Sequence, residues 1–155
     1  MQTEDRLARD LDWCLASQPL MSSDAWCAGL ALPGRALKLP APPHPHHFRL
    51  GQHFERLLAT WLSASPDHEL IANNVQVQDG RRTVGEFDFL VRTRQGVEHW
   101  EAAIKFYLGC GDGKSLADWY GPNTADRFDI KYERLVSRQL VLSQTEAGQR
   151  ALREL

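Results

Sequence analysis

Acidic and basic side chains recur along two neighbouring segments of the sequence TVGEFDFLVRTRQGVEHWEAAIKFY, residues 83–107. If both segments are strands, Glu86 and Asp88 share one face of the first, and Glu101 and Lys105 share one face of the second. Carboxylates that lie this close repel each other and raise each other's pKa unless a positive charge lies between them. A divalent cation resolves the repulsion, because Mg²⁺ is usually held by one or two carboxylates together with water and a phosphate.

The register of the hairpin decides how close Asp88 and Glu101 come. A four-residue loop, TRQG, sets the two residues directly opposite each other, whereas a two-residue loop at Gln95-Gly96 sets them on a diagonal. Both registers make the two carboxylates neighbours. The pattern also fits an ordinary solvated face, on which a cross-strand Glu–Lys pair is plain surface electrostatics.

A sheet is needed to position these side chains, and the surrounding sequence predicts an α/β fold that contains one. Alternating apolar residues predict three antiparallel strands, and Asp79-Gly80 is a strong turn signal between the first two. The core face of the last two strands is predicted to carry Phe87, Phe89, Val91, Trp100, Ala102, Ile104 and Phe106. The predicted order is a helix at 3–18, a long proline-rich connection at 19–47, a helix at 49–64, strands within 69–78, 81–92 and 97–108, a loop at 109–122, a helix from Asn123 or Thr124 to about Leu140, and a short helix within 144–155.

Length and composition limit the class of protein. A chain of 155 residues is expected to form one domain, which divides into residues 1–48 and a core at 49–155. The net charge of −2 gives no global attraction to nucleic acid, so such binding would need a local basic patch. The three cysteines are widely spaced, which is typical of reduced thiols rather than of a disulfide framework. No apolar run is long enough to span a membrane. The first residues are too charged for a secretory signal. We expect a cytoplasmic protein, whose oligomeric state the sequence leaves open.

Basic residues recur along one side of the helix predicted after residue 124. Their spacing of four, three and four positions predicts a single stripe, formed by Arg127, Lys131, Arg134 and Arg138. Such a stripe could contact nucleic-acid phosphates, since these contacts supply most non-specific affinity. It could equally be a solvated face that the neighbouring acids Asp126, Asp129 and Glu133 partly neutralise.

Several longer stretches carry a resemblance to a known family. The order helix, three-stranded meander, helix resembles the core of the PD-(D/E)XK, or restriction-endonuclease-like, nuclease superfamily. More specifically, RDLDWCLASQPL, LGQHFERLL, GEFDFLV, HWEAAIKFYLG, WYGPNTADRFDIKYERL and RQLVLS resemble the bacterial family called domain of unknown function 1853, which is grouped with these nucleases. Members of that family are usually longer, so several alternatives stay open: the final strand of the nuclease core is missing, the chain is a truncated piece, or it is a short member of the family.

The resemblance implies a phosphodiester-hydrolysing site for DNA or RNA. Asp88 and Glu101 would bind Mg²⁺ or Mn²⁺, and Lys105 would orient or deprotonate the attacking water. Glu55, on the first core helix, would be a supporting acid. Gln139 would correspond to the glutamine that some exonuclease-like members carry late in the second helix.

The sequence departs from the superfamily at one position. The usual acid lies two residues before the lysine, where Ala103 stands here, and Glu101 lies four residues before Lys105. Two residues of strand span about 6.6 Å and four span about 13 Å. Three alternatives follow: a bulge bends the strand, the acid has migrated, or the fold persists without catalysis and binds nucleic acid or a protein partner.

Overall fold

The computed structural model describes residues 2–17, 21, 49–123 and 125–155. The predicted proline-rich connection, residues 19–47, lies outside the described residues apart from Met21. The chain forms two compact units, Met1–Pro66 and Asp67–Leu155. The division falls after the helix at 50–64, within the segment 49–155 that was predicted to form one core.

The first unit contains helices α1 (Gln2–Ala16) and α2 (Leu50–Ala64), close to the bounds predicted for both. Asp10 on α1 accepts a hydrogen bond from Nε2 of His53 on α2, at 2.9 Å. The apolar stripe of α2 is buried at Leu57, Leu58, Trp61 and Leu62. Of the helices in the described part of the chain, none is long and apolar enough to cross a membrane.

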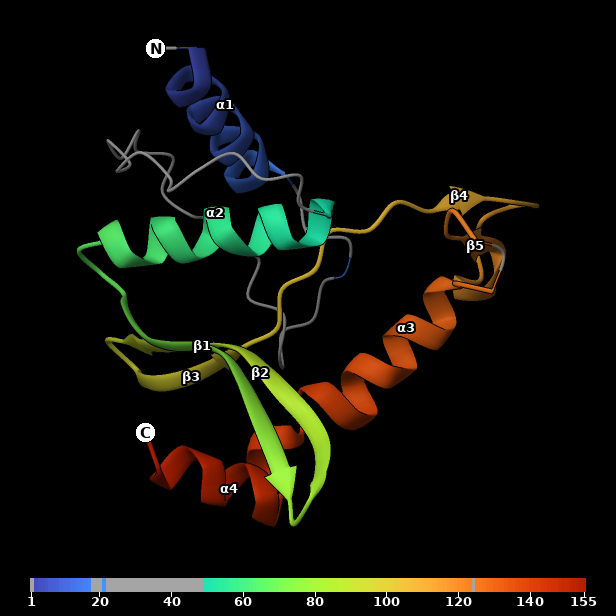
Figure 1. Cartoon of the computed structure of the whole chain (residues 1–155). Helices are drawn as coiled ribbons and strands as arrows, with labels where there is room; N and C mark the ends of the chain where they lie inside the picture. The colour runs from blue at the N-terminus through green and yellow to red at the C-terminus, as the bar shows by residue number, and fades with distance from the viewer. Residues whose placement is uncertain (1, 18–20, 22–48, 124) are drawn as a thin grey trace. The chain divides into compact units, whose positions relative to one another are not determined.

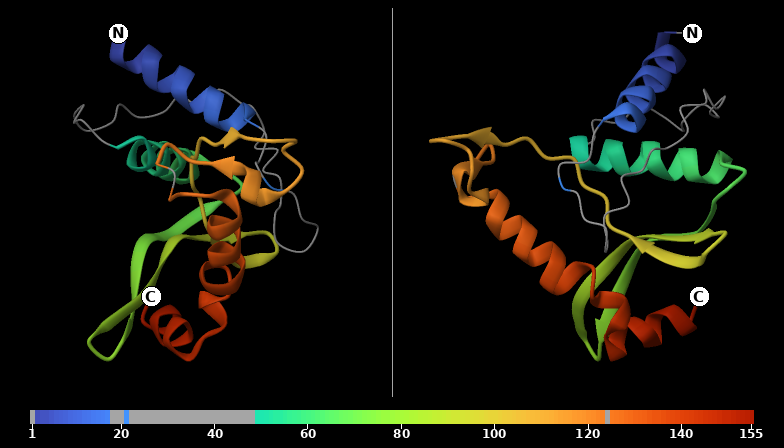
Figure 2. Two further views of the ribbon diagram at one scale, coloured as in Figure 1. Left: turned by 90° about the vertical axis from the view of Figure 1, so that its right-hand side faces the viewer. Right: turned by 180° about the vertical axis from the view of Figure 1, so that it is seen from behind.

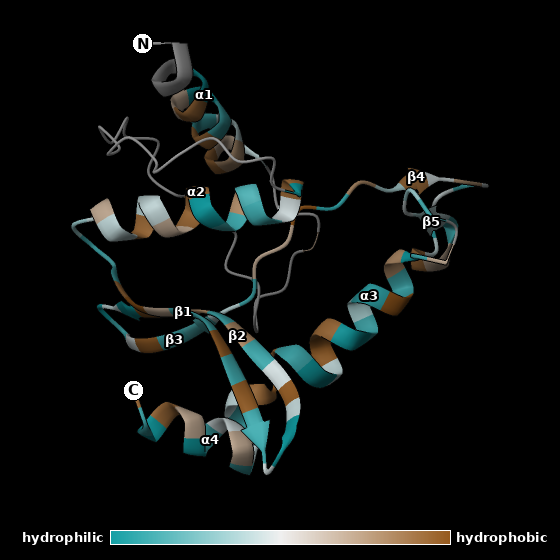
Figure 3. Cartoon of the chain, in the orientation of Figure 1, coloured by the Kyte–Doolittle hydropathy of each residue, from teal (hydrophilic) through white to brown (hydrophobic). Residues whose placement is uncertain are grey.

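The second unit is built on an antiparallel sheet in the order β1-β2-β3, which confirms the predicted meander (Figure 1). β1 spans Glu69–Asp79 and β2 spans Arg82–Thr93. Gly80 has a φ of +60° in the turn between them, a conformation that a residue without a Cβ adopts readily. Apolar and polar residues alternate along β2 (Figure 3), yet both of its faces are covered at the centre, because Phe87, Phe89, Leu90 and Val91 are all buried.

The third strand is much shorter than predicted. β3 spans only Gly96–Trp100, and residues 101–107 are not in a strand. The backbone N–H of Ala102 donates instead to the carboxylate of Asp88, so a side chain takes the place of a ladder partner. The expectation that Phe106 faces the core is therefore wrong, and this residue is 57% exposed.

The predicted loop at 109–122 contains a small two-stranded sheet. β4 (Leu108–Gly109) pairs with β5 (Trp119–Tyr120), and the short 3₁₀ turn η1 (Leu116–Asp118) precedes β5. Gly109 allows close packing here, since a Cβ at this position would lie 3.2 Å from the Trp119 ring.

The helix predicted from Asn123 or Thr124 begins later. Before that helix, Gly121 N–H donates to the Asp126 carbonyl and Asp126 N–H donates to the Asn123 carbonyl. Because these groups are used locally, helix α3 starts at Phe128 and runs to Arg134. A turn of π-helix, η2 (Leu135–Gln139), continues it.

The chain ends in the 3₁₀ turn η3 (Leu142–Gln144) and helix α4 (Glu146–Arg153), close to the predicted final helix. α4 lies beside the β1–β2 hairpin (Figures 1 and 2). Thr145 caps the helix by accepting the Gly148 N–H at 3.0 Å. The packing of η3 and α4 on the hairpin forms a core cluster of Val77, Phe87, Leu90, Leu142 and Ala147.

Candidate functional site

The hairpin register brings Asp88 and Glu101 together. Phe89 on β2 pairs with Trp100, the last residue of β3, so the next residues outward are Asp88 and Glu101. This is the directly opposed register of the two that the sequence left open. Oδ2 of Asp88 accepts the Ala102 N–H at 3.1 Å, which ties the Asp88 carboxylate to the backbone immediately after Glu101.

The Glu101 carboxylate is buried and bonded at both oxygens. Its side chain is only 4% exposed. Nε2 of His99 donates to Oε1 at 2.7 Å, since an ionised carboxylate can only accept. Nε2 of Gln139 donates to Oε2 from the π-helical turn. His99, two residues before Glu101, and Gln139, 38 residues after it, therefore fix this carboxylate in one orientation.

His99 is buried on the same network. Its side chain is 6% exposed, and its ring lies edge-on to the ring of Phe87, with centroids 4.7 Å apart. Nδ1 has no hydrogen-bond partner among the residues that the structure describes. His99 is not among the predicted site residues, although it lies two residues before Glu101, a spacing that places two side chains on the same face of a strand.

Lys131 extends the network from the helix side. Its Nζ donates to Oε1 of Gln139 at 2.8 Å, so the amine reaches Glu101 through a single amide. Burial lowers the pKa of the Lys131 amine. The negative charge of Glu101, and more weakly that of Asp88, raises this pKa. The amine therefore lies within electrostatic range of both acids. The spacing of the basic residues had predicted a stripe that either contacts phosphates or is solvated.

The π-helical turn explains how Lys131 and Gln139 meet. Eight residues separate them, and in a regular α-helix this spacing would leave the second side chain about 80° around the axis from the first. The π-helical turn Leu135–Gln139 contains one residue more than an α-helical turn, so the angular position of later residues around the axis is set back by about 100°. Gln139 then lies on the same side of the helix as Lys131. No local sequence pattern indicated this irregularity.

Lys105 lies off the sheet, contrary to the prediction that it shares a strand face with Glu101. Its Nζ pairs with Oδ2 of Asp126 at 3.1 Å. The Lys105 charge still lowers the pKa of Lys131, so the two amines lie within electrostatic range of each other. Glu86 remains on β2 and is exposed.

Four predicted residues remain to be placed on the elements of the fold: Glu55, Arg127, Arg134 and Arg138. Glu55 lies on α2 in the first unit. Arg127 precedes α3 and forms a two-pronged pair with Asp129, at 3.0 and 2.6 Å, which raises the pKa of Arg127 and lowers that of Asp129. Arg134 and Arg138 are exposed, but the surplus residue of the π-helical turn displaces Arg138 from the regular stripe.

The donor atoms of the two acids are of the chemical type that a hard divalent cation prefers. Asp88 and Glu101 supply carboxylate oxygens, which Mg²⁺ and Mn²⁺ prefer, and they lie on adjoining segments. Among the described residues, no group of three or more His, Cys, Asp or Glu side chains is placed to hold a metal ion. A cation here would therefore have two protein carboxylates and complete its shell with water and phosphate.

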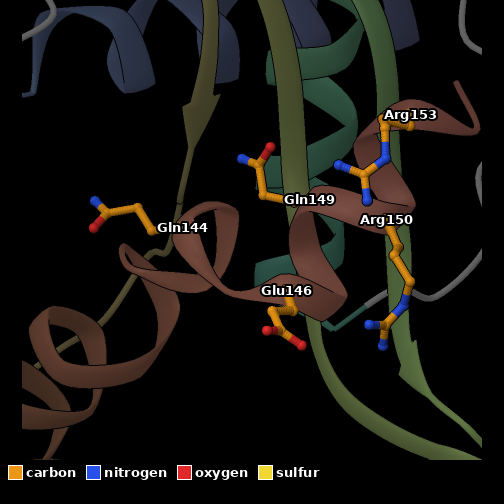
Figure 4. Close-up of a pocket in the computed structure, with 5 residues that line it drawn as sticks. All are labelled: Gln144, Glu146, Gln149, Arg150 and Arg153. Atoms are coloured by element: carbon orange, nitrogen blue, oxygen red, sulfur yellow. The ribbon is translucent and has the colours of Figure 1, made fainter.

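A separate surface pocket lies on the C-terminal helix and shares no residue with this network. Its volume is about 310 Å³, and Gln144, Glu146, Gln149, Arg150 and Arg153 line it (Figure 4). Arg150 is bonded to Asp79 at 2.8 Å.

Comparison with known proteins supports the family resemblance. No curated protein and no solved structure matches the chain. One family model, described as Domain of unknown function (DUF1853), matches residues 9–155. The match covers the Asp88–Glu101 pair and the helix that carries Lys131 and Gln139. The chain therefore belongs to the DUF1853 family.

Proposed function

We propose that this chain is a divalent-metal-dependent nuclease of the PD-(D/E)XK, restriction-endonuclease-like, superfamily, which hydrolyses phosphodiester bonds in DNA or RNA. Asp88 and Glu101 would hold Mg²⁺ or Mn²⁺. The observation that carries the proposal is the opposition of these two carboxylates at the end of β3, with a lysine amine in range of both. The succession of helix, three-stranded meander and helix supports it.

The residues around the two acids perform a positioning role in this proposal. His99 and Gln139 hold the two oxygens of Glu101, and Ala102 N–H holds Asp88. Groups fixed in this way need little reorganisation when charge develops on a phosphate. The bound cation would polarise the phosphate and lower the pKa of a bound water.

A second candidate function is a nucleic-acid-binding or protein-binding domain without catalysis. One specific observation favours it: both Glu101 oxygens already have protein partners, so a cation must share or displace one of them. Ala103 also favours a domain without catalysis, because it stands where the nuclease superfamily usually has an acid.

Calorimetric titration with Mn²⁺ and Mg²⁺ tests the proposed cation site. We expect binding by the unaltered chain and its loss in Asp88→Asn, which removes a charged oxygen donor with almost no change in shape. Asp67→Asn is the matched control, because Asp67 is an exposed carboxylate paired with Arg94 and should leave the titration unchanged.

Cleavage of single-stranded DNA, duplex DNA and RNA, each with and without Mn²⁺, tests the activity. We expect metal-dependent cleavage of at least one substrate and a loss of about 100-fold or more in Asp88→Asn. Cation binding without cleavage of any substrate would favour the second candidate. Absence of cation binding would reject the nuclease.

A further inference from the structure

Two lysines compete for the role of the amine at the proposed site. Lys105 has the place that the family resemblance implies, but it belongs to a segment that has left the sheet. Its ammonium pairs with the carboxylate of Asp126 at 3.1 Å, and its side chain is 40% exposed. A partly solvated, already paired amine contributes little electrostatic stabilisation to a neighbouring phosphate.

Lys131 is linked to Glu101 through the side chain of Gln139. Its Nζ donates to Gln139, whose amide donates in turn to the buried Glu101 carboxylate. An ammonium group has three N–H donors. Within the described part of the chain Gln139 accepts one of them, so two remain for the oxygens of a ligand.

The charges around Lys131 agree with this placement. Burial removes part of the hydration of the amine and thereby lowers its pKa. Glu101 and Asp88 face it as anions and raise its pKa, while Lys105 and Arg134 are the cations that lower it. A desolvated cation beside two carboxylates interacts more strongly with an entering phosphate than a solvated one does.

We infer that Lys131, rather than Lys105, is the amine that acts on the scissile phosphate at the Asp88–Glu101 site. This inference rests on the proposed function. It also accounts for the unusual spacing around Ala103: if the lysine comes from the helix, its distance along the strand from the acid no longer matters.

Paired substitutions test the inference. Lys131→Met keeps the length and apolar stem of the side chain and removes the charge, and Lys105→Met does the same at the competing position. We expect cleavage to fall by about 100-fold in Lys131→Met and to stay within about threefold in Lys105→Met. Lys114→Met is the control, since Lys114 is exposed and pairs with Asp112.

Cation affinity provides a readout that does not depend on activity. Removal of a positive charge next to two carboxylates should strengthen Mn²⁺ binding by about tenfold in calorimetry of Lys131→Met. If Lys131 only supported the fold, its loss would weaken cation binding and cleavage together, which would overturn the inference. Lys131→Arg keeps the charge and a donor, so it should restore the affinity of the unaltered chain and part of the cleavage.

The outcomes separate the inference from the function on which it rests. Loss of cleavage in Lys105→Met, with cleavage retained in Lys131→Met, would overturn the inference and leave the nuclease proposal intact. If the unaltered chain neither binds Mn²⁺ nor cleaves any substrate, both are rejected.

Discussion

Glu101 depends on two neighbouring side chains, His99 and Gln139. A carboxylate removed from water costs several kcal/mol unless hydrogen bonds compensate, and Glu101 receives one bond at each oxygen. The alternating sequence was sufficient to predict that Asp88 and Glu101 are neighbours. It could not predict that His99 and Gln139 clamp Glu101, because the second of these contacts joins residues 38 positions apart.

The cysteines allow a prediction at the scale of single residues. Burial raises the pKa of the Cys14 thiol, and the charge of Asp10 adds to the effect, whereas Cys110 is exposed. Because the thiolate is the nucleophile, iodoacetamide at pH 8 should label Cys110 about ten times faster than Cys14. Peptide mass spectrometry over time measures both rates, and equal rates in the native protein would contradict the prediction. In urea the difference should disappear.

At the scale of elements, the sequence predicted the long and strongly periodic pieces well. Helix α2 and strands β1 and β2 have apolar residues at the expected periods, and their bounds agree with the prediction within a residue or two. The end of β3 was missed because alternation continues through VEHWEAAIKFYL, while Ala102 N–H bonds to the distant Asp88 side chain instead of to a strand partner. The break in helix α3 was missed for a similar reason, since its π-helical turn has no local signature.

The packing of η3 against β2 gives a prediction for one glycine. A Cβ at Gly85 would lie 2.7 Å from Cδ2 of Leu142, which is buried in the core cluster. We expect Gly85→Ala to lower the free energy of unfolding by about 1–3 kcal/mol, because overpacking forces the neighbours apart.

Gly51→Ala is the matched control for that change. Gly51 lies in α2, and an added Cβ would meet no described atom within 4 Å. Alanine should therefore stabilise the helix, by at most about 1 kcal/mol. Urea unfolding measures both variants. If Gly85→Ala left the free energy of unfolding unchanged, the Leu142 side chain could move aside without loss of stability, and the prediction would be contradicted.

The scale of the whole molecule concerns Glu55, the supporting acid that the family resemblance implies. Glu55 belongs to Met1–Pro66, and the Asp88–Glu101 pair belongs to Asp67–Leu155. The supporting role expected for Glu55 therefore stays a prediction. Sequence periodicity defines elements within a unit, but it carries little information on how one unit faces another.

The overall charge leads to a prediction for nucleic-acid binding. A chain with 18 basic and 20 acidic residues has no global attraction to phosphate, so any affinity must come from a few exposed cations such as Arg134 and Arg138. The slope of log K against log salt for a single-stranded oligonucleotide should be no steeper than about −2. Replacing both arginines with alanine should reduce its magnitude by about 1.4, given about 0.7 per contact on single strands.

Fluorescence anisotropy at several salt concentrations measures this slope. Arg153→Ala, an exposed cation on α4, should leave it unchanged. A slope that stays the same after loss of both Arg134 and Arg138 would place the contact surface elsewhere.

The surplus residue in the turn Leu135–Gln139 has an evolutionary consequence. If the chain lost one exposed residue there, such as Ser137, the segment could relax into an ordinary α-helix, and both of its ends would keep their places. The glutamine would then follow the lysine by seven positions, a spacing that aligns them without any distortion. Relatives with a one-residue gap at this point can thus preserve the same pairing, and an alignment that forces the gap elsewhere would hide it.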